Sequence, residues 1–157
     1  MEATERVFVL HCFDPDLRPI VMGLLAELGI EKTAICFNPA GGCKDLAAPT
    51  LDSDTGYIMR QVHLAVELGA THVIVLNHTD CRAYQKAFGQ FPSKEKEEAL
   101  HKKHMEKSEA IIRAVYPRLT FEHRLARLER ASAERPTSVE FVTVKPRPQN
   151  EMVPVAV

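Results

Sequence analysis

Short apolar runs alternate with longer amphipathic stretches through the first half of the chain. Three of these runs, Val7–Cys12, Lys32–Asn38 and His72–Asn77, are rich in strand-forming residues and predict buried strands. Between them, residues 16–29 and 54–69 carry apolar side chains at helical spacing and predict two helices. The third run is continuous and β-branched, which is typical of a strand covered on both faces in a parallel sheet. Strands that alternate with helices in this order indicate an α/β fold.

A long charged stretch dominates the second half of the chain. Residues 94–115 predict a helix that Pro117 ends, and the first half of this helix is crowded with lysines and glutamates. That pattern is typical of a solvated face stabilised by opposite charges one turn apart. His101 and His104 lie on this helix three residues apart, so we expect their rings to be solvated as well.

The C-terminal third of the sequence is less regular. Residues 119–135 fit a strand and a helix equally well, whereas Val139–Val144 predicts a last strand. Residues 146–157 contain three prolines and predict an extended arm. For residues 1–157 together we expect one domain, a three-layer α/β sandwich whose central sheet of four to five strands is mainly parallel and flanked by helices.

Composition and charge argue against several classes of partner. The chain has 157 residues, with 20 Lys and Arg against 21 Asp and Glu, and a net charge of -1. Because it has no basic excess, no Trp and only 6% aromatic residues, we do not expect it to bind nucleic acid or a membrane surface. No apolar run approaches the ~20 residues of a membrane span, and the charged N-terminus lacks the features of a secretory signal. We therefore expect a cytoplasmic protein that acts on a small molecule.

Four cysteines raise the question of what thiols do in a reducing compartment. Their even number permits two disulfides, but packing, metal ligation and catalysis are the uses expected there. Cys36 lies inside the predicted second strand and is expected to be inert core. Cys43 follows a Gly-Gly loop, and the sequence leaves open whether it packs in the interior, lines a pocket or pairs with another thiol.

Cys12, His78 and Cys81 fall at the ends of predicted parallel strands. Cys12 ends the first strand, and the other two follow the third strand in a His-x-x-Cys segment. Because the sites of open α/β sheets gather outside the carboxyl ends of the strands, we expect the three side chains at one edge. Two thiolates and an imidazole are a standard ligand set for Zn²⁺, and three protein ligands leave a fourth position for water, as in catalytic sites. The alternative is that both cysteines are small buried hydrophobes.

Three segments together resemble a known family. Leu10–Asp14 (LHCFD), Asn38–Gly42 (NPAGG) and Val75–Cys81 (VLNHTDC) occur in the order of the motifs of β-class carbonic anhydrases. That family has a Cys-x-Asp-x-Arg segment after its first strand, a Gly-Gly loop after its second and a His-x-x-Cys segment after its third. The resemblance spans about residues 6–88. It implies a homodimer or higher homo-oligomer that hydrates CO₂ reversibly to bicarbonate by attack of zinc-bound hydroxide.

The resemblance also implies catalytic roles for individual residues. The three candidate ligands correspond to the zinc ligands of the family, and Asp14 corresponds to the carboxylate that accepts a hydrogen bond from zinc-bound water. The arginine that holds this carboxylate in the family stands two residues later, where this chain has Asp16. Arg18 therefore takes that role across a two-residue insertion. A competing alignment pairs Asp16, in place of Asp14, with Arg18.

Other positions of these segments form the substrate pocket that the resemblance implies. Gly41 and Gly42 match the loop beside the metal, where backbone N–H groups approach the substrate, and Cys43 follows them. Arg82 stands where the family usually has glycine and brings a cation to the pocket, whereas Asp16 adds a carboxylate at its mouth. A zinc site closed by such a carboxylate would be catalytically silent, with a structural or sensor role. A third alternative is a hydrolase of a CO₂-like molecule such as COS or CS₂.

Overall fold

The computed structural model describes residues 5–132 and 135–149, with the side chains of residues 129–139 left out of that description. The strands within it are Arg6–His11 (β1), Ala34–Phe37 (β2), Ala70–His78 (β3), Thr120–Ser132 (β4) and Arg135–Lys145 (β5). In this described part of the chain they form one sheet of five strands in the order β2-β1-β3-β4-β5. The first four strands in that order run parallel, and β5 runs antiparallel to β4.

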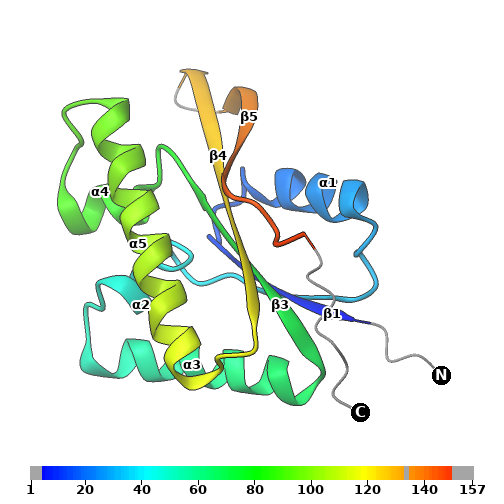
Figure 1. Cartoon of the computed structure of the whole chain (residues 1–157). Helices are drawn as coiled ribbons and strands as arrows, with labels where there is room; N and C mark the ends of the chain where they lie inside the picture. The colour runs from blue at the N-terminus through cyan, green and yellow to red at the C-terminus, as the bar shows by residue number, and fades with distance from the viewer. Residues whose placement is uncertain (1–4, 133–134, 150–157) are drawn as a thin grey trace, which may run out of the picture.

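Helices cover both faces of this sheet. Their bounds are Arg18–Leu28 for α1, Lys44–Ala47 for α2, Asp52–Glu67 for α3, Arg82–Phe88 for α4 and Lys94–Val115 for α5. Figure 1 shows α1 on one side of the sheet and α2, α3 and α5 on the other. The predicted three-layer α/β sandwich with a mainly parallel sheet is therefore confirmed. None of the described helices is long and apolar enough to cross a membrane.

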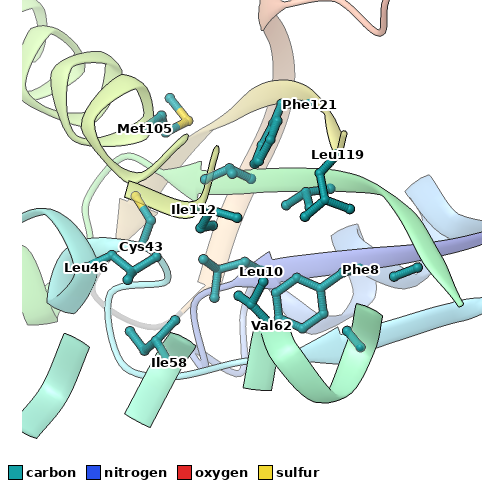
Figure 2. Close-up of a cluster of buried hydrophobic side chains, with 14 residues drawn as sticks. Phe8, Leu10, Cys43, Leu46, Ile58, Val62, Met105, Ile112, Leu119 and Phe121 are labelled. Carbon is teal, nitrogen blue, oxygen red and sulfur yellow. The ribbon is translucent and has the colours of Figure 1, made fainter. Parts of the chain in front are cut away.

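The alternation of side chains along β1 divides the core between the two layers. Phe8 and Leu10 point to the layer of α2, α3 and α5, where Figure 2 shows them near Val62 of α3. Val9 points to the opposite layer and packs in a second cluster with Leu24 of α1. Because successive side chains of a strand face opposite sides, a strand covered on both faces must be apolar at nearly every position. This explains the continuous apolar runs of the central strands.

The structure shows whether the ambiguous residues 119–135 form a strand or a helix. Within this stretch, residues 120–132 form β4, which pairs in parallel with β3 and in antiparallel with β5, and residues 133–134 lie outside the described part of the chain. The predicted last strand, Val139–Val144, is confirmed as part of β5. Residues 146–149 of the predicted arm have no regular secondary structure, and residues 150–157 lie outside the described part of the chain.

The prediction that Cys36 is inert core is wrong. This residue is exposed, because it belongs to β2, a strand of only four residues at the edge of the sheet. An edge strand has a neighbouring strand on one side only, and the helices cover its side chains incompletely. The position of a strand within a sheet depends on topology, which a local apolar pattern does not contain.

The prediction that His101 and His104 are solvated is also wrong. Their exposed fractions are 0% and 6%, because α5 packs on the sheet through the face that carries them. Met105, Ser108 and Ile112 are buried on the same helix at spacings of three and four residues. The buried face of α5 is therefore mainly polar, because it also includes Glu97 and Glu109, and the lysines and the other glutamates lie on the remaining surface.

Candidate metal centre

The carboxyl ends of β1 and β3 bring together the three predicted metal ligands. Cys12 follows β1 directly, His78 is the last residue of β3, and Cys81 precedes α4. The two strands are parallel neighbours, so the residues that follow them meet at one edge of the sheet. Between His78 and Cys81, the left-handed φ of Asp80 (55°) turns the chain. All three candidate ligands are buried, and their ligand atoms lie within 4.8 Å of one another.

The donor atoms fit a zinc ion. Cys12 Sγ and Cys81 Sγ lie 3.8 Å apart, and two thiolates bound tetrahedrally at about 2.3 Å from zinc would be separated by about 3.8 Å as well. Nδ1 of His78 donates to the carbonyl oxygen of Thr79 at 2.8 Å, which leaves the lone pair on Nε2. That Nε2 atom is buried and has no hydrogen-bond partner among the described residues. An imidazole with an unsatisfied nitrogen beside two thiols is a donor set that suits zinc.

Thr79 fixes this histidine to the sheet. Its N–H donates to the carbonyl oxygen of Ala126 at 3.0 Å, and its hydroxyl accepts from the N–H of Leu128 at 3.0 Å. Both partners lie on β4, so the carbonyl group that orients His78 is held by a neighbouring strand. Contacts of this kind set the ring orientation and the tautomer of a metal-ligating histidine.

The two thiols differ in their tendency to ionise. The Cys81 thiol, and after it His78, lowers the pKa of Cys12, although burial opposes this. Contact with the Cys12 sulfur, reinforced by burial, raises the pKa of Cys81. Burial lowers the pKa of His78, but its contact with Cys12 outweighs burial and the pKa is raised overall. The backbone N–H of Gly41 also donates to Cys12 Sγ at 3.2 Å. Cys12 is therefore the thiol that more readily becomes a thiolate, the form that binds metal.

A glycine loop closes over Cys12. Gly41 and Gly42 have φ angles of 80° and 61°, in the left-handed region that favours glycine. A Cβ atom on Gly42 would lie 2.9 Å from Asn77 Oδ1 and 3.3 Å from the backbone nitrogen of Cys12. The loop therefore approaches the ends of β1 and β3 so closely that only a residue without a side chain fits at Gly42.

A pocket of about 300 Å³ opens beside the candidate ligands. Its walls are Cys12, Phe13, Asp14, Pro15, Ala40, Arg82, Ala83 and Lys86. Asp14 is buried, and its Oδ1 accepts the backbone N–H of Asp16 at 3.0 Å. Among the described residues, the group of ligand atoms within 4.8 Å of one another consists of two thiols and one imidazole and contains no carboxylate. The candidate centre thus combines three protein donors with an adjoining pocket.

The other predicted site residues lie at different depths. Arg18 is the exposed first residue of α1, and its charge contributes, after burial, to the lowered pKa of His11 at the end of β1. Arg82 is the exposed first residue of α4 and belongs to the pocket wall. Cys43 is not among the walls of this pocket but lies fully buried in the apolar cluster of Figure 2. Burial raises the pKa of Cys43 to about 11.

Sequence reasoning missed a buried polar network next to the candidate ligands. Asn77 Nδ2 lies 3.2 Å from the Tyr84 hydroxyl and 3.0 Å from His101 Nδ1, and the same hydroxyl lies 3.0 Å from His104 Nδ1. Because an amide nitrogen can only donate, the Tyr84 hydroxyl accepts from Asn77, and the same hydroxyl shares a second hydrogen bond with His104 Nδ1. His101 likewise accepts at Nδ1 and carries its proton on Nε2, 3.6 Å from Glu97 Oε1. The spacing of the two histidines on one helix was the available signal.

Comparisons with known proteins found little at the level of sequence. No family model matches the chain, and no curated protein matches it. Among solved structures, the chain is similar to the β-carbonic anhydrase CafA of the fungal pathogen Aspergillus fumigatus. The two share 13% sequence identity with a TM-score of 0.48, over 78% of this chain and 71% of that one. The fold stands on the sheet topology, and the candidate metal centre on its own interatomic distances.

Proposed function

We propose that this chain is a zinc enzyme that hydrates CO₂ reversibly to bicarbonate, as the β-class carbonic anhydrases it resembles do. The observation that carries this proposal is the cluster of Cys12, His78 and Cys81 at the wall of a pocket, without a fourth ligand among the described residues. Structural zinc sites use four protein ligands, so the arrangement favours an open catalytic site over a closed one. Zinc bound there would lower the pKa of a coordinated water to about 7 and so supply a nucleophile near neutral pH.

Asp14 orients the attacking water in this proposal. It stands in the pocket wall next to Cys12, and the N–H of Asp16 fixes one of its carboxylate oxygens. The carboxylate accepts the O–H of the water and directs the lone pair of the water oxygen toward the carbon of CO₂. Arg18, four residues on, is the residue that holds Asp14 in this proposal. A new C–O bond forms, one C=O electron pair moves to oxygen, and a proton passes to buffer, so CO₂ and H₂O give HCO₃⁻ and H⁺.

The side chains around Asp14 shape the entry of the substrate. Phe13, Pro15 and Ala40 are apolar walls of the same pocket and exclude water from one side of the donors. CO₂ has no net charge or dipole, so an apolar wall receives it without loss of hydrogen bonds. The Gly41 N–H remains engaged with Cys12 Sγ, which spreads the charge of the thiolate and supports its role as a ligand.

Zinc content and CO₂ hydration test this proposal on the full chain. The purified protein should hold one zinc per chain and should accelerate CO₂ hydration in stopped-flow assays with a pH indicator. Cys12→Ser should lose most of the zinc and the activity, because a hydroxyl is a much poorer zinc ligand than a thiolate. Cys36→Ser is the matched control, since the exposed Cys36 lies on an edge strand and should keep both zinc and activity.

Three outcomes separate the parts of the proposal. If Cys12→Ser retains full zinc content, the ligand assignment is wrong. If the wild-type chain holds zinc but hydrates CO₂ no faster than buffer, the reaction is wrong and the catalytically silent zinc protein is favoured. If Cys36→Ser loses zinc to the same extent as Cys12→Ser, the loss reports general instability and the test does not support a specific site at Cys12.

A further inference from the structure

The pocket beside the candidate metal centre is larger than CO₂ needs. Its volume is about 300 Å³, whereas a water molecule has a share of about 30 Å³ in the liquid. The pocket is therefore several times larger than a water-sized group, and it has more room than the three atoms of CO₂ need. A volume of this order is at the lower end of pockets that hold small organic ligands.

The pocket also carries two cations on one helix. Arg82 and Lys86 are four residues apart on α4, so they lie on the same face of that helix, and both line the pocket. Both side chains are exposed, and neither has an ion-pair partner in the part of the chain that the structure describes. Asp14 is the acidic wall residue of the same pocket, next to the Cys12 thiol.

The charges of the pocket are therefore separated by depth. Cys12 and Asp14 are buried, whereas Arg82 and Lys86 are exposed and stand at the mouth. With Zn²⁺ bound, its two positive charges would balance the two thiolates. Among the residues that line the pocket, which do not include Asp16, the two cations against the single carboxylate of Asp14 would then leave a net positive charge. Phe13, Pro15, Ala40 and Ala83 supply the apolar surface of the same pocket.

We propose that the substrate of this site is a small organic anion larger than CO₂ or bicarbonate. Its apolar body of a few carbons fills the pocket, its carboxylate or phosphate group meets Arg82 and Lys86, and its electrophilic carbon points to the metal centre. This proposal rests on the function proposed above and changes only the molecule to which water is added. The electrophilic carbon is a carbonyl carbon: the water oxygen forms a new C–O bond to it, the C=O electron pair moves to the carbonyl oxygen, and one proton of the water passes to that oxygen. CO₂ is then the smallest substrate that the centre accepts. Arg82 and Lys86 are the specificity-determining residues. Arg82 stands at a position where the family that this segment resembles usually has glycine.

A series of ligands of increasing length tests this proposal on the full chain. The probes are acetate, butyrate and hexanoate, with butyramide and hexanamide as neutral analogues, and binding is measured by calorimetry on zinc-loaded and zinc-free protein. Affinity should rise at least tenfold from acetate to hexanoate, because the added methylenes leave water for the apolar wall. Each amide should bind at least tenfold more weakly than its carboxylate.

Charge-removing variants show whether the mouth of the pocket is responsible. The double variant Arg82→Gln/Lys86→Gln should bind hexanoate at least tenfold more weakly and bind hexanamide as before. The matched control is Lys32→Gln/Arg60→Gln, which removes the same charge from exposed residues that do not line this pocket, and it should bind hexanoate like the wild type.

Several results would overturn the proposal. They are equal affinity for acetate and hexanoate, equal affinity for a carboxylate and its amide, and an equal loss in both double variants. Equal affinity along the series would mean that Arg82 contacts only bicarbonate-sized anions. Zinc content is measured on the same samples. A chain that binds hexanoate through Arg82 and Lys86 but holds no zinc would overturn the function proposed above while the anion site stands. A zinc-loaded chain that hydrates CO₂ but does not select longer anions would overturn the anion site and leave the function proposed above standing.

Discussion

Replacing Gly42 with alanine would show how tightly the glycine loop is pressed against the candidate metal ligands. The new Cβ would lie 2.9 Å from Asn77 Oδ1 and 3.3 Å from the backbone nitrogen of Cys12. The amide of Asn77 cannot rotate away cheaply, because its nitrogen bonds both Tyr84 and His101 in the interior. The backbone of Cys12 cannot move without shifting the end of β1.

Two costs add in this variant. Alanine in the left-handed region costs about 1 kcal/mol relative to glycine, and an added methyl group in a packed interior costs about 1–3 kcal/mol. Gly29→Ala is the matched control, because Gly29 has a φ of 67° but no atom within 4 Å of its Cβ position. The control carries only the first cost, and both variants share the entropy that alanine removes from the unfolded chain. We therefore expect Gly42→Ala to be less stable than Gly29→Ala by about 1–3 kcal/mol.

Urea unfolding of the reduced, zinc-free protein measures this difference, and competition with a chromophoric chelator measures zinc affinity. Gly42→Ala should also weaken zinc binding by about tenfold, since a contact that positions a metal ligand contributes on that scale. Gly29→Ala should leave zinc affinity unchanged. If the two variants are equally stable and bind zinc equally well, the loop does not press on Cys12, and the argument from close approach fails.

Two further predictions concern buried polar groups that are not themselves candidate ligands. Tyr84→Phe should lower the free energy of unfolding by about 1–3 kcal/mol, because it leaves two buried partners without their hydroxyl, whereas the exposed Tyr57→Phe should change urea unfolding by less than about 0.5 kcal/mol. Equal effects would contradict the network. Burial opposes ionisation of Glu109, but hydrogen bonds from Lys145 and Arg113 outweigh it and hold its pKa below the usual value. Its carboxylate thus stabilises the fold above about pH 4.3, and this contribution is lost as pH falls through the lowered pKa. Zinc-free Glu109→Gln should lose about 1–2 kcal/mol at pH 7, and a deficit that does not shrink in acid would refute this.

The sequence predicts the sheet and the approach of the ligands because both depend on strand ends. The apolar runs of β1 and β3 are continuous, so they locate strands covered on both faces, and the polar residues that follow fall at the carboxyl edge. Cys12, His78 and Cys81 could therefore be placed near one another from their positions alone. The structure brings their ligand atoms within 4.8 Å of one another.

The surroundings of these ligands could not be predicted in the same way. Which face of α5 meets the sheet depends on tertiary packing, and a stripe that contains His101 and His104 has no apolar periodicity to identify it. Both rings are nevertheless buried, because Asn77 and Tyr84 satisfy their Nδ1 atoms. Cys36 shows the opposite error, since an apolar strand pattern does not reveal that the strand lies at an edge.

Asn77 connects the parts of the molecule that hold the candidate ligands. It precedes His78 on β3, its Oδ1 faces the glycine loop over Cys12, and its amide nitrogen reaches Tyr84 on α4, the helix that follows Cys81. Cys12 follows β1, His78 ends β3 and Cys81 precedes α4, so their spacing depends on contacts that join these three elements. The β1–β3 ladder fixes Cys12 relative to His78, and Asn77 fixes both relative to α4. A metal bound by ligands held in this way stabilises the fold by its binding free energy, so zinc affinity and unfolding should change together when these contacts are removed.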